Sequence, residues 1–238
     1  MNKRLVWLPN LFTSLTLVSG FYSMTLALEG FLSAAVNAIM VAMVFDFLDG
    51  WIARRTNTVT DFGKEYDSLC DMVAFGLAPA ITVYELLTWD SVLAWLVPAL
   101  YSLAVAARLA RFNASSCTQA GFEGLPCTAG GPFIVLLCYF FYPHASPMVS
   151  GVLTITTLAI GILMNSTVPY RSLKKKQRFM TLKVLGPSAF ILAAFLLKVP
   201  LSTLAVILLL YIISPLYLIR GFIRQRRQRR QLVEQNIG

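Results

Sequence analysis

Four aspartates lie in one short window of a chain that is otherwise rich in apolar residues: Asp46, Asp49, Asp67 and Asp71. Their spacings of three and four residues place each pair on one face of a helix. A carboxylate inside a membrane costs roughly 2.5–3.5 kcal/mol on insertion scales. Hard divalent cations take oxygen ligands and offset that cost. The pattern predicts a site in which two helices, with two carboxylates each, hold two Mg²⁺ or Mn²⁺ ions.

Two glycines and an arginine accompany the acids. Gly50 lets a ligand approach the backbone of the first helix closely, and Gly63 marks the bend before the second helix. Arg54 follows Gly50 by one turn and is placed to bind a phosphate through its planar guanidinium. Two metal ions beside such an arginine favour displacement at phosphorus. The alternative is a divalent-cation binding or transport protein, although the acids fall near a membrane edge and no inverted repeat of broken helices is visible.

The elements that position these residues are predicted to be transmembrane helices. The chain has 238 residues, 57% of them hydrophobic, and apolar runs of about 20 residues, enough to cross a bilayer, recur along it. We expect an all-α, polytopic helical bundle that forms a single membrane domain over 1–238, with a catalytic core over about 5–180. C-terminal helices and a basic tail would follow over 181–238. Eight spans are predicted, with six as the alternative: 11–28, 33–54, 66–87, 91–110, 129–142, 147–165, 182–197 and 201–220.

The distribution of basic residues predicts the orientation of the bundle. With the N-terminus in the cytoplasm, 19 of the 20 lysines and arginines fall in cytoplasmic segments, and only Lys198 lies outside. Both termini and all four aspartates then face the cytoplasmic side of the cell membrane. The basic stretch at 224–230 is interpreted as binding anionic lipid headgroups, and no nucleic-acid partner is expected. The four cysteines do not suggest disulfides, and His144 is expected on the side opposite the aspartates.

The order of these residues resembles the signature of the CDP-alcohol phosphotransferases. That signature reads Asp-x-x-Asp-Gly-x-x-Ala-Arg, eight residues, Gly-x-x-x-Asp-x-x-x-Asp, and every fixed position is met from Asp46 to Asp71. Members of this family are integral membrane enzymes that transfer a phosphatidyl or similar group from a CDP-linked donor to an alcohol and release CMP. The resemblance implies that the four aspartates bind metal and that Asp71 also serves as the base. It further implies that Gly50, Arg54 and Gly63 contact the cytidine diphosphate group and that the protein is a homodimer.

A stretch near the N-terminus adds to this resemblance. Pro9-Asn10-x-x-Thr13 is similar to a stretch that the family carries before its first span. The resemblance makes Asn10 and Thr13 candidate contacts for the nucleotide of the CDP-lipid. A helix N-cap turn is the alternative interpretation of the same residues.

The acceptor alcohol depends on residues outside the signature. The segments 67–79, 108–113 and 122–126 are similar to those of membrane-integral phosphatidylserine synthases, which implies CDP-diacylglycerol as donor and L-serine as acceptor. Arg108 and Arg111 share one helix face, and at least one of them is expected to bind the serine carboxylate, with Asn113 beside them. Both arginines would otherwise only end a helix at the headgroups. Glycerol 3-phosphate, inositol phosphate and choline stay open as acceptors.

Overall fold

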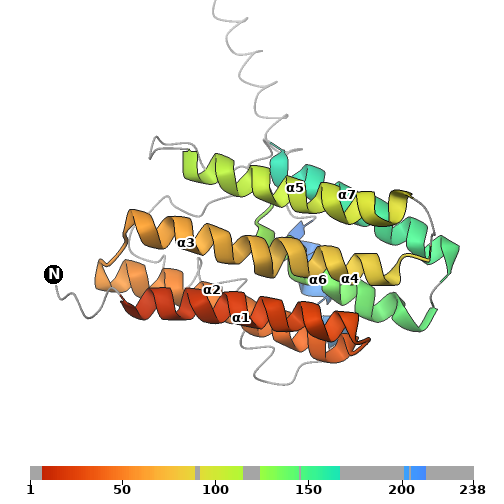
Figure 1. Cartoon of the computed structure of the whole chain (residues 1–238), viewed down its shortest axis with the longest axis horizontal. Coiled ribbons are helices and arrows are strands. Elements are labelled where there is room, and N and C mark those ends of the chain that lie inside the picture. The colour runs from red at the N-terminus through yellow and green to blue at the C-terminus, as the bar shows by residue number, and fades with distance from the viewer. Residues whose placement is uncertain are drawn as a thin grey trace, which may run out of the picture.

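The computed structural model describes residues 7–88, 92–114, 124–144, 146–166, 201–203 and 205–212. Helices make up most of this part of the chain, and no strand occurs in it. They are α1 (Trp7–Leu28), α2 (Leu32–Thr56), α3 (Asp61–Asp71), η2 (Met72–Leu77), α4 (Ala78–Leu86), α5 (Val92–Ala114), α6 (Cys127–Phe141), η3 (Tyr142–His144) and α7 (Pro147–Asn165). Figure 1 shows the long helices packed side by side as one bundle. The all-α prediction is confirmed.

α1 and α2 form an antiparallel hairpin whose link is fixed by backbone hydrogen bonds. Gly30 has a left-handed φ of 80°, which glycine adopts without strain. Its N–H donates to the Ala27 carbonyl at 3.0 Å, and the Phe31 N–H donates to the Leu26 carbonyl at 2.9 Å. This pair of bonds is the Schellman pattern that ends many helices. It turns α2 back along α1, so that Asp49, near the end of α2, lies beside an early turn of α1.

α3, η2 and α4 run on as one helix of 26 residues that contains a π-helical segment in its middle. Pro79 explains the interruption, because it has no N–H for the carbonyl of Phe75, four residues earlier. The hydroxyl of Tyr101, a fully buried residue of α5, donates to that carbonyl at 2.8 Å instead. The π segment follows Asp71 directly, so it sets how the acidic start of this helix is oriented relative to its apolar end.

Two glycines let neighbouring helices approach the π segment at backbone distance. A Cβ built on Gly20 of α1 would lie 2.4 Å from the Cα of Ala74. A Cβ built on Gly131 of α6 would lie 2.8 Å from the carbonyl oxygen of Phe75. Because protein interiors are close-packed, a larger residue at either position would push the helices apart. The π segment is therefore held from two sides, which fixes the helix that carries Asp71.

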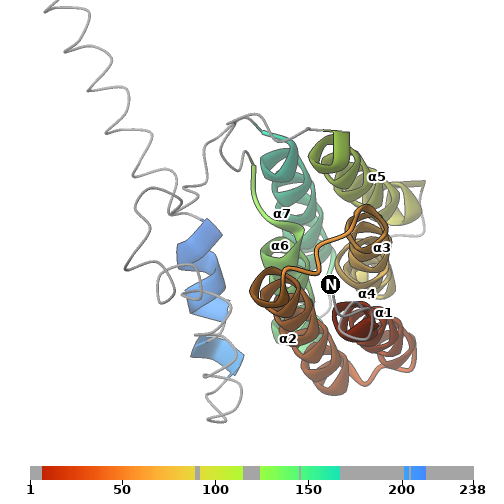
Figure 2. The ribbon, with the colours of Figure 1, turned by 90° about the vertical axis from the view of Figure 1, so that its left-hand side faces the viewer.

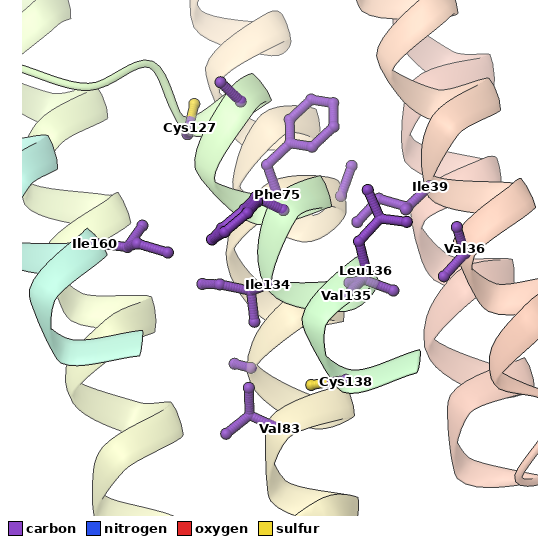
Figure 3. Packing of buried hydrophobic residues seen from close by; sticks show 14 of the residues in the cluster. Val36, Ile39, Phe75, Val83, Cys127, Ile134, Val135, Leu136, Cys138 and Ile160 are labelled. Atoms are coloured by element: carbon purple, nitrogen blue, oxygen red, sulfur yellow. The ribbon is translucent and has the colours of Figure 1, made fainter. Parts of the chain in front are cut away.

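α6 lies in the middle of the bundle, among α2, α4 and α7 (Figure 2). Its side chains face Ile160 of α7 on one side and Val36 and Ile39 of α2 on the other (Figure 3). With 15 residues, α6 is shorter than the roughly 20 that a bilayer span needs. Ten of those residues are nevertheless buried, because other helices cover most of its surface.

A helix occupies each of the first six predicted spans, with corrected limits. Within the described ranges, five helices are long and apolar enough to cross a membrane: Trp7–Leu28, Leu32–Thr56, Asp61–Leu86, Ala94–Ala114 and Pro147–Asn165. α1 begins earlier than the predicted residue 11, since Pro9 is tolerated in a first turn, so Asn10 lies inside the first helix together with Thr13. The predicted span at 182–197 lies outside the described residues, as does the end of the one at 201–220. The count of eight stays a prediction.

Candidate active site

The charged residues gather at one end of the bundle, where α2 ends, α3 begins and α5 ends, at the left of Figure 1. Every lysine and arginine in the described ranges lies at or near this end: Arg54, Arg55, Lys64, Arg108 and Arg111. The opposite end carries Glu29, Glu85 and His144. This one-sided arrangement is the one that the positive-inside rule predicts for a membrane protein.

Three of the four predicted aspartates meet at this end. Asp46 and Asp49 from α2 and Asp67 from α3 offer carboxylate oxygens that all lie within 4.8 Å of one another. Asp71 follows one turn further along α3 and interacts electrostatically with the other three carboxylates. Its side chain is 7% exposed, and its Oδ1 atom has no hydrogen-bond partner within the described residues.

The donor set fits a divalent metal ion. Carboxylates this close repel one another unless a cation or a shared proton lies among them. The ligand atoms are all hard oxygens, which suit Mg²⁺ or Mn²⁺ better than soft metals. Asp71, one turn further along α3, adds a fourth buried carboxylate that interacts with the other three. The predicted acid cluster is thus present, with Asp71 at its inner edge.

Thr13 lies against one of the metal-binding candidates. Its hydroxyl donates to Asp49 Oδ2 at 2.7 Å and also lies 3.1 Å from the Pro9 carbonyl oxygen, four residues earlier. Both Thr13 and Asp49 are buried. In this geometry Thr13 orients a carboxylate, a role that partners of metal ligands commonly take. Its predicted contact with the nucleotide stays a prediction.

Gly63 is placed where the start of α3 meets α1. A Cβ built on Gly63 would lie 3.1 Å from Thr60 Oγ1 and 3.3 Å from Asn10 Oδ1. The Thr60 side chain caps α3 by accepting from the Gly63 N–H at 3.0 Å. The small residue therefore permits the cap and brings Asn10 to the acidic end of the site.

Gly50 makes room for Arg54. A Cβ built on Gly50 would lie 3.3 Å from Arg54 Nη1, so the guanidinium folds back over the backbone of α2. From there its charge acts on Asp46, Asp49 and Asp67. The guanidinium of Arg54 thus lies beside the acids, as the sequence predicts. Gly50 leaves the space that this position of Arg54 needs.

Arg108 and Asp71 are joined through Cys127, which lies just before the predicted span 129–142. Cys127 is the first residue of α6 and is 1% exposed. Arg108 Nη1 donates to its sulfur at 3.3 Å, and its thiol lies 3.7 Å from Asp71 Oδ2, with the thiol as donor. Arg108 is 7% exposed and its Nε has no hydrogen-bond partner within the described residues. In the sequence, the one feature that could have drawn attention to Cys127 is that it directly follows 122–126, a segment similar to that of phosphatidylserine synthases.

The other two predicted serine-binding residues contact neighbouring helices. Arg111 donates from Nη1 to the Asn165 carbonyl at 3.0 Å and from Nη2 to the Met164 carbonyl at 3.3 Å, which satisfies the last turn of α7. The side-chain amide of Asn113 donates to Glu65 Oε2 at 2.8 Å on α3. Of the three candidates, Arg108 is the one whose guanidinium lies on the chain of contacts to Asp71.

A comparison with protein-family models finds a match to "CDP-alcohol phosphatidyltransferase" over residues 6–169. That range includes the helices α1 to α7. It also includes the complete acid cluster and the contacts from Asp71 to Arg108. The matched region is therefore the part of the chain in which the candidate site is assembled.

Individual curated proteins are similar over comparable lengths. A CDP-diacylglycerol–serine O-phosphatidyltransferase of Helicobacter pylori is 32% identical over 225 residues, which cover 91% of this chain and 90% of that protein. A protein of the same name from Methanocaldococcus jannaschii is 36% identical over 156 residues, 64% of this chain and 73% of the relative. An archaetidylserine synthase of Methanothermobacter thermautotrophicus is 34% identical over 165 residues, 68% of this chain and 69% of the relative.

Proposed function

Since the chain belongs to the CDP-alcohol phosphatidyltransferase family, we propose that it transfers the phosphatidyl group of CDP-diacylglycerol to the hydroxyl of L-serine. The products are phosphatidylserine and CMP. The observation that carries the proposal is the position of Asp71, a buried carboxylate between the acid cluster and Arg108. The side of Asp71 that faces the other aspartates suits a pyrophosphate with its metal ions. The side that faces Cys127 and Arg108 suits a small acceptor with a negative charge.

Serine as acceptor is supported by two independent observations. The relatives' names differ in the lipid part, diacylglycerol in one and archaetidyl in another, whereas both contain serine. In this chain the Nε–H of the buried Arg108 has no acceptor among the described residues and lies at the proposed acceptor side, which suits a carboxylate. We assign the carboxylate to Arg108, and to Arg111 and Asn113 the role of fixing the end of α5 that carries it.

The reaction follows from these positions. The serine hydroxyl oxygen attacks the β-phosphorus of CDP-diacylglycerol, and Asp71 accepts the hydroxyl proton. A P–O bond to serine forms, the P–O bond to CMP breaks, and CMP leaves as the anion. Two divalent ions held by Asp46, Asp49, Asp67 and Asp71 would neutralise the pyrophosphate charge. The chain's single histidine lies at the opposite end, so no Ser–His pair is available there, which favours direct transfer.

The donor is proposed to lie over α2 and the start of α3. Arg54 binds a phosphate of the pyrophosphate, and Gly50 and Gly63 keep the surface low enough for the nucleotide to approach. Asn10 lies beside Gly63 and contacts the nucleotide from α1. The acyl chains stay in the surrounding lipid.

The protein is proposed to lie in the cytoplasmic membrane with this end facing the cytoplasm, as a homodimer. Labelling of an Arg55→Cys variant by a membrane-impermeant thiol reagent tests the orientation. The cysteine should react in inverted vesicles and not in intact cells; the reverse pattern would contradict the proposal. Light scattering of the detergent-solubilised protein tests the homodimer, and a monomer mass would exclude it.

The activity is tested with purified protein in detergent, CDP-diacylglycerol, Mn²⁺ or Mg²⁺, and labelled L-serine. We expect lipid-linked serine and CMP in equal amounts; the absence of both would overturn the proposal. The same assay with glycerol 3-phosphate, inositol phosphate and choline tests the acceptor, and faster transfer to one of them would reassign it. Arg108→Gln should raise the serine KM about 10–100-fold, as loss of a charged hydrogen bond does, without changing the CDP-diacylglycerol KM.

A further inference from the structure

Two unsatisfied polar atoms flank the thiol of Cys127. Asp71 Oδ1 is an acceptor without a donor, and Arg108 Nε–H is a donor without an acceptor, within the described residues. Both side chains are 7% exposed, so bulk water does not readily satisfy these atoms. Buried polar atoms without partners are costly and are rare in proteins. A ligand that offers a hydroxyl to one atom and a carboxylate to the other would satisfy both.

The thiol lies between the two charged groups and keeps them from pairing. Cys127 donates to Asp71 Oδ2 and accepts from Arg108 Nη1, at 3.7 and 3.3 Å. No direct ion pair between Asp71 and Arg108 occurs within the described part of the chain. A thiol is both a weak donor and a weak acceptor, so it bridges an anion and a cation without satisfying either completely. A direct pair would instead consume the groups that the acceptor needs.

The thiol is held at this place by the packing of its helix. Cys127 begins α6, which is enclosed by α2, α4 and α7. Figure 3 shows Cys127 at the start of α6, with Ile134 further along the same helix. Gly130 and Gly131 in the next turn pack against α7 and the π segment, since a Cβ on Gly130 would lie 2.4 Å from Met164 Cε. The sulfur therefore has little freedom to move relative to α3.

We propose that Cys127 is a positioning residue that sets the separation of Asp71 and Arg108 and so selects an acceptor whose hydroxyl and carboxylate are two carbons apart. The inference rests on the proposed function, which it deepens by naming the acceptor class as short β-hydroxy-α-amino acids. Serine carries both groups that this site would bind, a hydroxyl for Asp71 and a carboxylate for Arg108. Homoserine is one carbon longer, and ethanolamine has no carboxylate.

The experiment compares Cys127→Ala with Cys127→Ser, using Cys138→Ala as a matched control. Cys138 is a fully buried cysteine of the same helix, at its other end, and lies in the apolar core. Serine KM, kcat, CDP-diacylglycerol KM and the ratio of kcat/KM for serine to that for homoserine are measured for each protein. Thermal unfolding in detergent reports any loss of stability. If Cys127→Ala does not fold, Cys127→Val replaces it, since valine also lacks a donor.

We expect Cys127→Ala to raise the serine KM about tenfold, because loss of both thiol contacts lets Asp71 and Arg108 shift and weakens a charged hydrogen bond to serine. The preference for serine over homoserine should fall by a similar factor, while the CDP-diacylglycerol KM stays within twofold. Cys127→Ser, which keeps a donor and an acceptor, should restore both values to within about threefold of wild type. Cys138→Ala should alter only the unfolding temperature.

Two results would overturn the inference while leaving the proposed function intact. One is an active wild type whose serine KM and homoserine discrimination are unchanged in Cys127→Ala. The other is a Cys127→Ser variant that behaves as Cys127→Ala does, because the thiol would then act through volume alone. A wild type that makes no lipid-linked serine would overturn the proposed function, and this inference with it.

Discussion

The two carboxylate edges of the site have similar spacing but different surroundings. The α2 edge, Asp46 and Asp49, has a neutral donor and a cation at hand: Thr13 donates to Asp49, and Arg54 lies over the adjacent backbone. The inner part of the α3 edge, Asp71, has a weak thiol donor and one oxygen that no described residue hydrogen-bonds. Asp71 is also bordered by a π segment, whereas the α2 edge lies on a regular α-helix.

The difference indicates a division of labour within one cluster. A carboxylate that is already hydrogen-bonded is fixed in orientation, which suits a metal ligand. A buried carboxylate with an unused oxygen is available for a proton and an incoming hydroxyl, which suits a base. We therefore interpret the α2 edge as the donor and metal side, and Asp71 with Arg108 as the acceptor side.

The largest effect should come from removing the base. Asp71→Asn keeps the shape of the side chain but cannot accept the serine proton, so turnover should fall about 10²–10⁴-fold. Binding of labelled CDP-diacylglycerol should stay within about threefold, since the other carboxylates and Arg54 remain. CMP release and lipid binding in detergent measure the two effects. Turnover like that of the wild type would contradict the division between the edges.

The α2 edge is broken most selectively by Thr13→Val, which removes the donor to Asp49 at nearly constant volume. The apparent affinity for Mn²⁺ or Mg²⁺, measured by metal titration of activity, should fall about 10–100-fold, with an unchanged serine KM. Thr16→Val is the matched control, because Thr16 lies in the same helix, is similarly buried and donates to the backbone carbonyls of Phe12 and Ala42. An equal loss in both variants would attribute the effect to packing.

The support of the α3 edge is tested at Gly20. Gly20→Ala would place a Cβ 2.4 Å from the Cα of Ala74, and this overpacking should cost about 1–3 kcal/mol of stability. Gly151→Ala is the control, since a Cβ on Gly151 of α7 has nothing within 4 Å and should leave stability unchanged or slightly higher. Thermal unfolding in detergent compares the two. Equal stability of both variants would show that the π segment is not held at Gly20.

The smallest effect on catalysis is expected from Arg111→Ala. The change removes two bonds to the last carbonyls of α7 and should lower the unfolding temperature slightly. The serine KM should change by less than about threefold, in contrast to the tenfold or larger effect expected for Arg108→Gln. A serine KM that rises as much as in Arg108→Gln would extend the acceptor side to Arg111.

Local spacing made much of the site predictable. Asp46, Asp49, Gly50 and Arg54 lie within about two turns of one helix, and Gly63, Asp67 and Asp71 within about two turns of the next, so helical periodicity places each set on one face. The helices themselves follow from apolar runs whose length a bilayer dictates. Their limits did not follow, because Pro9 lies inside α1 and a polar stretch opens α3 at Asp61.

Contacts between distant segments were not predictable in the same way. Cys127 meets Asp71 across 56 positions of sequence, and no periodicity relates the two. Arg111 pairs with the end of α7, which the sequence does not distinguish from a headgroup contact. The π segment had one visible sign, Pro79, but where Phe75 finds a donor depends on Tyr101 in another helix.

The π segment also bears on how this chain tolerates changes in length. A π turn accommodates one residue more than the α-helix around it, and each residue of an α-helix rotates the chain by about 100°. Deleting a single residue from Met72–Leu77 would convert the π turn into a regular α turn and leave Asp67 and Asp71 facing α2, whereas a deletion elsewhere in this helix would rotate them by about 100°. The extra residue is thus absorbed within the π turn, and Met72–Leu77 is the place where this helix can lose one residue without turning its catalytic half against its membrane-packing half.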